Sequence, residues 1–198
     1  MSEQQYFAAD PAARHRPGRV HLVLPEALLE LDTDSGVFSP GRLDPGTRLL
    51  LDAAPDPPPR GDLLDLGCGY GPAALTLAVR APAARVWAVD VNRRALDLCA
   101  ANAARAGLAN VRCASPDDPA LPGAFAVIWS NPPIRIGKQA LHDLLSRWLG
   151  RLAPGAAAFL VVQRNLGADS LQRWLAGGGW SAERAAARGG YRLLRLTR

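Results

Sequence analysis

Short apolar runs alternate with longer amphipathic segments from residue 61 to the end of the chain. Runs such as "DLLDLG" and "AFAVIWS" have the length and composition of buried strands, whereas "NRRALDLCAANAARAG" repeats its apolar positions with helical spacing. The pattern predicts strands at 62–67, 85–91, 110–115, 124–130, 156–163, 180–187 and 191–197, and helices at 72–81, 92–107, 138–153 and 169–178. Because strands that alternate with helices form βαβ units, we expect an α/β domain with a mostly parallel sheet and a C-terminal antiparallel hairpin.

The first sixty residues follow a different pattern. Residues 1–18 are mostly polar and predict a flexible tail, and the alternating runs at 19–24 and 28–34 predict a small hairpin. The helix predicted at 47–54 begins after "DPG", residues 44–46, and the linker "PDPPPR" closes this section. With 198 residues and 48% hydrophobic content, the chain is long enough for one buried core. We therefore expect a single structural domain, with the section 19–60 packed on a core formed by 61–198.

Composition excludes several classes of protein. The sequence has no run of about 18 apolar residues and no apolar stretch typical of a signal peptide, so we expect a soluble, cytoplasmic protein. Cys68, Cys99 and Cys113 lack the spacing of a disulfide framework or a zinc site, and no metal is expected. The net charge of +5 is compatible with an anionic partner such as nucleic acid. Lys138 is the only lysine, however, and an arginine-rich codon bias explains part of this charge equally well.

A glycine-rich loop, "DLGCGYGP", connects the first core strand to the first core helix. Glycine tolerates positive φ and lets a ligand approach the backbone, and Pro72 suits a first helical turn. Pro72 also stands where a G-x-G-x-x-G dinucleotide motif has its third glycine, which disfavours NAD. Asp90 ends the next strand, where a carboxylate can accept both hydroxyls of a ribose. Taken singly, the loop is also typical of a tight turn, and Asp90 of a helix cap.

A third loop, "SNPPIRIGK", follows the strand at 124–130. Together with "DLGCGYG" and "AVDVN", the stretch "SNPPI" resembles class I S-adenosylmethionine-dependent methyltransferases, whose Rossmann-like sheet has seven strands. The upstream "SGVFSPGRLDPGTRLLL" is similar to the small-domain group that includes the 16S ribosomal RNA guanine-N2 methyltransferases. The resemblance runs from about residue 22 to the C-terminus and implies S-adenosylmethionine as cofactor and ribosomal RNA or the small ribosomal subunit as partner.

The resemblance also implies roles for individual residues. The glycine loop would surround the methionine part of the cofactor, with Asp65 supporting the loop and meeting the amino group, Thr47 near the carboxylate, and Asp90 on the ribose. The implied cofactor-binding residues are Thr47, Asp65, Gly67, Cys68, Gly69, Tyr70, Gly71, Asp90, Val91, Asn92, Ser115, Pro116, Asp117 and Asn131. The implied catalytic residues are Asn131, Pro132, Pro133 and Ile134.

The sequence departs from its relatives at three points. Pro116 stands where many relatives place an acidic or amide side chain on the adenine amine, with Asp117 one residue later. Ile134 replaces the Phe or Tyr that often follows the proline pair and stacks on a planar target. The larger guanine-N2 enzymes also have an additional N-terminal domain absent from this sequence, so we expect substrate recognition to be local or to come from a partner.

The chemistry of "NPP" follows from the problem of methylating an exocyclic nitrogen. In guanine, adenine or a carboxamide the nitrogen lone pair is delocalised, so the amine must be oriented toward the methyl group. The Asn131 side-chain oxygen could accept one N–H of the amine and the Pro132 carbonyl the other. These two hydrogen bonds would orient the amine without a metal or a covalent nucleophile. The sequence therefore predicts an N-methyltransferase, with guanine N2 in 16S rRNA favoured. A protein glutamine or other amide N-methyltransferase, and a cofactor-binding accessory protein without turnover, are the alternatives.

Overall fold

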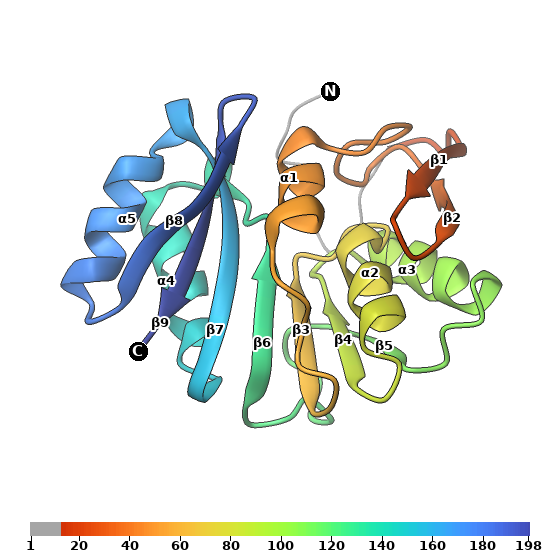
Figure 1. The fold of residues 1–198 in the computed structure, drawn as a ribbon. Helices are drawn as coiled ribbons and strands as arrows, with labels where there is room; N and C mark the ends of the chain where they lie inside the picture. Colours follow the sequence, from red (N-terminus) through yellow and green to blue (C-terminus); the bar gives the residue numbers. More distant parts are fainter. Residues whose placement is uncertain (1–12) are drawn as a thin grey trace.

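The computed structural model describes residues 13–198, which form a seven-stranded sheet flanked by helices (Figure 1). The strand order is β5-β4-β3-β6-β7-β9-β8. The strands are β3 (Asp62–Leu66), β4 (Arg85–Val89), β5 (Val111–Ala114), β6 (Phe125–Ser130), β7 (Leu152–Gln163), β8 (Ser181–Arg188) and β9 (Tyr191–Thr197). Neighbouring strands from β5 to β7 are parallel, and β9 is antiparallel to both β7 and β8. The predicted fold class and its C-terminal hairpin are confirmed.

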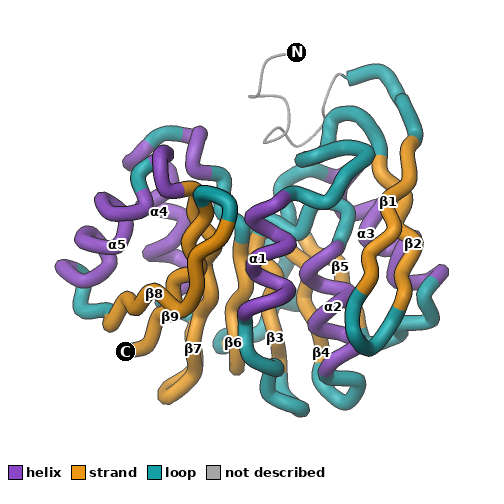
Figure 2. Tube along the Cα trace, turned by 45° about the horizontal axis from the view of Figure 1, so that its top comes forward, coloured by secondary structure: helices purple, strands orange, loops and turns teal. Residues whose placement is uncertain are grey.

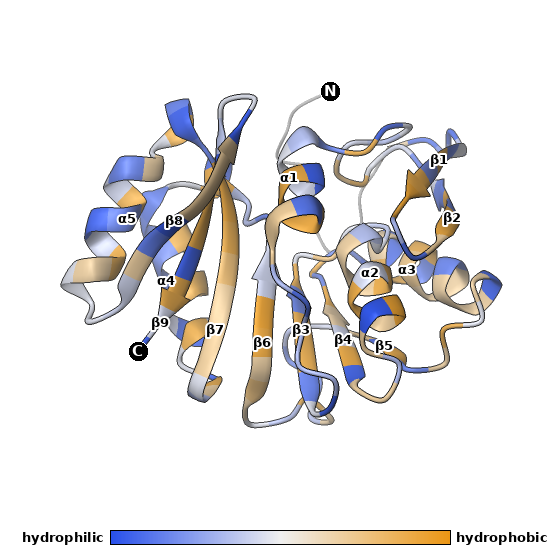
Figure 3. Cartoon of the chain, in the orientation of Figure 1, coloured by the Kyte–Doolittle hydropathy of each residue, from blue (hydrophilic) through white to orange (hydrophobic). Residues whose placement is uncertain are grey.

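Helices cover both faces of the sheet (Figure 2). One face packs against α1 (Pro45–Ala53), α2 (Pro72–Arg80) and α3 (Arg93–Arg105), the other against α4 (Lys138–Leu149) and α5 (Ala168–Gly177). Two short 3₁₀ helices, η2 (Ile134–Ile136) and η3 (Arg164–Leu166), follow the ends of β6 and β7. The central strands are mostly apolar, β8 at the edge of the sheet is more hydrophilic, and the helices turn their hydrophilic residues outward (Figure 3).

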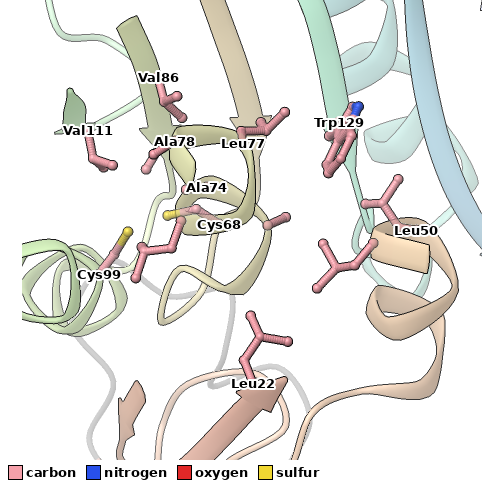
Figure 4. Close-up of a cluster of buried hydrophobic side chains, with 14 of the residues drawn as sticks. Leu22, Leu50, Cys68, Ala74, Leu77, Ala78, Val86, Cys99, Val111 and Trp129 are labelled. Atoms are coloured by element: carbon pink, nitrogen blue, oxygen red, sulfur yellow. The ribbon is translucent and has the colours of Figure 1, made fainter. Parts of the chain in front are cut away.

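Small side chains let the helices approach the sheet closely. In the cluster of Figure 4, Ala74 and Ala78 of α2 are fully buried, and Leu77 packs beside them toward Trp129 of β6. Trp129 is fully buried. Cys68, Cys99 and Cys113 are free thiols, and the first two are buried in this core. The glycine loop and α3 are thereby held against the same packed layer.

The N-terminal section forms a separate two-stranded sheet. Strands β1 (Gly18–Val23) and β2 (Leu28–Thr33) pair antiparallel, as expected, and lie beside α3. Residues 1–12 of the predicted tail lie outside the described residues, so flexibility there stays a prediction. Before β1, a ring nitrogen of His15 lies 2.5 Å from the carboxylate of Asp34. No helix within residues 13–198 combines the length and hydrophobicity needed to cross a membrane.

The predicted boundary between the fourth core helix and the strand after it was wrong. The helix expected at 138–153 ends at Leu149, and the strand expected to begin at 156 already begins at Leu152. The reason is tertiary pairing: the backbone N–H of Phe125 donates to the Arg151 carbonyl at 2.8 Å, and Leu152 then pairs with Phe125. A local apolar pattern cannot reveal a contact with a strand more than twenty residues away.

Candidate active site

The strand order reverses between β3 and β6, and the loops that follow β3, β4 and β6 meet at that edge of the sheet. In open α/β sheets this is the place where ligands bind. A cavity of about 330 Å³ lies there. Its walls contain Thr47, Asp65, Gly67, Cys68, Gly69, Tyr70, Asp90, Val91, Asn92, Pro116, Asn131, Pro132, Pro133 and Ile134 among the residues predicted from the sequence.

The three loop glycines differ in what surrounds them. Gly67, Gly69 and Gly71 all have positive φ, at 76°, 53° and 100°. A Cβ added at Gly67 or Gly69 would meet no atom within 4 Å, because both positions face open space at the cavity. At Gly71 it would lie 2.7 Å from the Cys99 sulfur. The first two glycines therefore leave room for a ligand, whereas Gly71 leaves room for the packing of α3 against α2.

Asp65 lies under the glycine loop at the end of β3 and is almost completely buried. One of its carboxylate oxygens accepts the backbone N–H of Ala74, in the first turn of α2, at 2.8 Å. Burial raises the pKa of Asp65 to about 7; the N–H of Ala74 opposes the shift and the negative charge of Asp90 adds to it. A buried carboxyl with this pKa beside a cavity is well placed to meet a cationic group.

Asp90 connects two of the loops. Its Oδ2 accepts the N–H of Gly69 at 2.9 Å, and its Oδ1 accepts the N–H of Asn92 at 2.9 Å. Burial raises the pKa of Asp90, and these backbone N–H groups oppose the shift. The N-cap of α3 is Asn92, whose side chain accepts from the N–H of Ala95. Asp90 is thus not the helix cap, and its carboxylate lies on the cavity wall, where it can accept from a ligand.

The loop after β5 contributes fewer residues to the cavity wall than the sequence predicted. Pro116 lies on the cavity wall, as does the exposed Val91 from the loop after β4. Ser115 and Asp117 are not among the lining residues, and Asp117 instead pairs with Arg147 at 2.8 Å. The adenine-binding roles implied for these residues remain predictions, and the structure places two of the three away from the cavity.

The Asn-Pro-Pro loop is anchored at both ends. The Ser130 hydroxyl donates to the Leu66 carbonyl at 2.7 Å, fixing the end of β6 against β3. Pro133 has φ −73° and ψ 77°, the geometry of an inverse γ-turn, and the Ile134 N–H donates to the Pro132 carbonyl at 2.8 Å. The Pro132 carbonyl is therefore fixed in direction and retains one lone pair for a further donor.

The side chain of Asn131 points its nitrogen toward α1. Nδ2 lies 2.9 Å from Oδ2 of Asp44 and 3.0 Å from Oγ1 of Thr47. Both amide hydrogens are thereby used, and Oδ1 accepts no hydrogen bond from the residues that the structure describes. Asn131 thus presents an acceptor at the cavity wall, and its role in positioning an amine stays a prediction.

The cavity wall also contains residues that the sequence did not single out. Phe38 and Leu166 are exposed apolar side chains at 43% and 37%, and Gln163 and Tyr191 stand opposite one another on β7 and β9. These residues come from the loop after β2, the end of β7 and the start of β9. No local motif marks them, because only the strand order brings these segments to the same edge.

Comparison with known proteins identifies the family. A family described as the methyltransferase small domain matches residues 28–195. The chain belongs to this family. The class I S-adenosylmethionine-dependent methyltransferase predicted from the sequence is confirmed, and S-adenosylmethionine is the cofactor of this class.

Two relatives and one solved structure show how far the similarity extends. The uncharacterized protein YbxB of Bacillus subtilis is 35% identical over 86% of each chain. Ribosomal RNA small subunit methyltransferase C of Ectopseudomonas mendocina is 38% identical over 71% of this chain and 44% of its own length. A T. thermophilus 16S rRNA N2 methyltransferase, solved with AdoMet and guanosine, has the same fold, with a TM-score of 0.74, 24% identity, and coverage of 95% of this chain and 52% of that one. The methyltransferase domain spans about half the length of the rRNA methyltransferases that it matches.

The residues around the glycine loop fit the cofactor. Gly67 and Gly69 leave open space where a side chain would stand, Asp90 offers a carboxylate on the cavity wall for hydroxyl donors, and Asp65 offers a buried carboxyl for an amino group. Within residues 13–198, no group of three or more His, Cys, Asp or Glu side chains is arranged to hold a metal.

Proposed function

We propose that the protein methylates the exocyclic N2 of a guanine in 16S ribosomal RNA. The observation that carries this proposal is a pair of acceptors at the end of β6, Oδ1 of Asn131 and the carbonyl oxygen of Pro132, on the wall of the cavity that also contains the glycine loop. An exocyclic amine has two N–H groups, and the two acceptors match them. The relatives named ribosomal RNA small subunit methyltransferase C support the choice of small-subunit rRNA as the substrate.

The two acceptors would orient the amine for transfer. The cofactor supplies an electrophilic methyl group on a sulfonium. As the new N–C bond forms, the C–S bond breaks with its electron pair going to sulfur, and the extra proton on nitrogen then leaves to water. Asn131 and Pro132 would hold the nitrogen lone pair on the line of attack and stabilise the positive charge that develops there. Both acceptors are fixed by neighbouring groups, so little reorganisation is needed.

The cavity wall suits a planar, aromatic target. Phe38 and Leu166 on this wall expose apolar surface, and Ile134 lies on it next to the proline pair. We propose that Phe38 provides the aromatic face that relatives supply after the proline pair, with Ile134 covering part of the base. Exposed basic side chains lie on the helical segments that follow β6 and β7, at Arg135 of η2, Lys138 of α4 and Arg164 of η3, and would contact the phosphate backbone.

A carboxamide would also match the two acceptors, so glutamine N-methylation is the outcome to exclude. The test incubates the protein with labelled cofactor and, separately, small ribosomal subunits, free 16S rRNA and protein extract, followed by mass analysis of nucleosides and peptides. Methylated guanosine labelled at N2 supports the proposal. Label in peptide glutamine alone would overturn it in favour of the amide reaction.

A further inference from the structure

We propose that Asp44 is a positioning residue that fixes the side-chain amide of Asn131 in the orientation required for methyl transfer. The proposal rests on the proposed role of Asn131 in holding the target amine. Asp44 is the N-cap of α1, and its Oδ2 accepts both the backbone N–H of Thr47 and Nδ2 of Asn131, each at 2.9 Å. Asp44 and Asn131 are 87 positions apart in the chain.

An asparagine amide has two orientations of nearly the same shape, and only one of them serves this reaction. With Oδ1 toward the cavity, Asn131 accepts an N–H of the amine. After a rotation that exchanges oxygen and nitrogen, a donor would face the amine and would compete for the lone pair that must attack the methyl group. The orientation of Asn131 therefore decides whether the amine is held productively.

Asp44 selects between these orientations because a carboxylate accepts hydrogen bonds and does not donate them. In the observed orientation a donor faces Oδ2 of Asp44 at 2.9 Å. The exchanged orientation would bring two oxygens together at that distance in a site where Asp44 is largely buried, which is strongly unfavourable. The Thr47 hydroxyl, which is both donor and acceptor, would tolerate either orientation, so it cannot make the selection alone.

The surrounding packing holds Asp44 in place. A Cβ added at Gly46 would lie 2.7 Å from the ring of Tyr191 and 2.9 Å from Oδ2 of Asp44. Gly46 thus lets the Tyr191 ring close over the first turn of α1 beside the carboxylate. Asp44 is fixed on one side by its own helix and on the other by β9.

Thr47 extends the arrangement toward the cofactor. Its Oγ1 accepts the second amide hydrogen of Asn131 at 3.0 Å, so its own hydrogen is left to donate elsewhere. The cofactor carboxylate predicted to lie near Thr47 is a suitable acceptor. Binding there would commit the Thr47 oxygen to accept from Asn131 and would strengthen the same amide orientation.

The test compares Asp44→Ser, Asp44→Asn and Asn131→Ala, with Asp56→Ser, an exposed acidic residue in the linker, as the charge-matched control. Serine and asparagine are good N-caps, so both variants at 44 should keep α1 folded. We expect Asp44→Ser to lower single-turnover rates by about 10²-fold at saturating cofactor, close to Asn131→Ala, with the affinity for S-adenosylhomocysteine nearly unchanged. The single-turnover rate of Asp44→Asn should lie between those of the wild type and Asp44→Ser, because the new amide can present either an acceptor or a donor to Asn131.

Nuclear magnetic resonance of the free protein gives a readout that does not depend on turnover. The Asn131 side-chain amide, identified by its loss in Asn131→Ala, should be downfield and slow to exchange in the wild type and in Asp56→Ser, and solvent-like in Asp44→Ser. Unchanged Asn131 signals in Asp44→Ser, or normal turnover in Asp44→Ser while Asn131→Ala is inactive, would overturn the proposal. Full activity in Asn131→Ala would instead contradict the proposed chemistry, and the resonance experiment would still report on the Asp44 contact.

Discussion

Oδ2 of Asp90 lies 2.9 Å from the backbone nitrogen of Gly69, so the carboxylate at the end of β4 is hydrogen-bonded to the glycine loop after β3. Two loops that are far apart in sequence therefore form one rigid wall of the cavity. The direction of the Asp90 carboxylate is set before a ligand arrives, which reduces the ordering cost of binding.

Replacement of Asp90 by Ala should weaken cofactor binding strongly. The variant loses a pair of charge-assisted hydrogen bonds to the ribose, each worth about 1.5–3 kcal/mol at most, and also the support of Gly69. Calorimetric titration with S-adenosylhomocysteine measures the change. Asp97→Ala, which removes an exposed acidic residue of α3, is the matched control and should bind like the wild type. Equal affinities for the two variants would refute the assignment of Asp90 to the ribose.

The raised pKa of Asp65 predicts that cofactor affinity depends on pH. In the free protein the pKa is about 7, so the carboxyl is largely protonated below that pH. A cationic amino group bound beside it would favour the carboxylate, so binding releases a proton and affinity rises with pH through about 7. The increase approaches about tenfold per pH unit on the acid side. Titrations with S-adenosylhomocysteine across this range should show the slope in the wild type, and Asp65→Asn should remove it. The same slope in both proteins would place the amino group elsewhere.

Replacement of each loop glycine by alanine should affect either cofactor binding or stability, depending on the position. Gly67→Ala and Gly69→Ala place a methyl group in open space at the cavity, so they should cost about 1–2 kcal/mol of stability for positive φ while abolishing cofactor binding. Gly71→Ala adds a clash with Cys99 and with Leu75 of α2, at 2.7 and 2.8 Å, and should lower the melting temperature far more. Thermal melts with and without S-adenosylhomocysteine separate the two effects. Similar stability losses at all three positions would show that the distinction is wrong.

An exchange of donor and acceptor between Asp44 and Asn131 gives a further prediction. Asn131→Asp alone puts two carboxylates together where the present distance is 2.9 Å, so its turnover should be low. The double variant Asp44→Asn with Asn131→Asp restores a donor opposite an acceptor and leaves a second carboxylate oxygen for the amine. Its single-turnover rate should exceed that of Asn131→Asp. If the fold-reduction in rate of the double variant equals the product of the fold-reductions of the two single variants, the residues are not directly coupled.

Much of the fold was predictable because buried strands and amphipathic helices have strong local signatures. The glycine loop, Asp90 and the Asn-Pro-Pro stretch could also be placed at one edge of the sheet, since the carboxyl ends of parallel strands share it. Asp44 was read from the sequence only as the start of a helix, because its contact with Asn131 depends on how α1 packs against β7 and β9. Phe38 and Gln163 carry no motif, and only the strand order brings them to the cavity.

We propose that Asn131 and Pro132 orient a guanine amine for methylation at N2. The decisive measurement is quantitative mass spectrometry of guanosine from 16S rRNA after single-turnover incubation with the wild type and with Asn131→Ala. Thermal melts and S-adenosylhomocysteine titrations serve as controls that both proteins are folded and bind the cofactor. We predict N2-methylguanosine with the wild type and a rate at least about 10²-fold lower with Asn131→Ala. Equal N2 methylation by the two proteins, or methylation only at a different atom, would contradict the account.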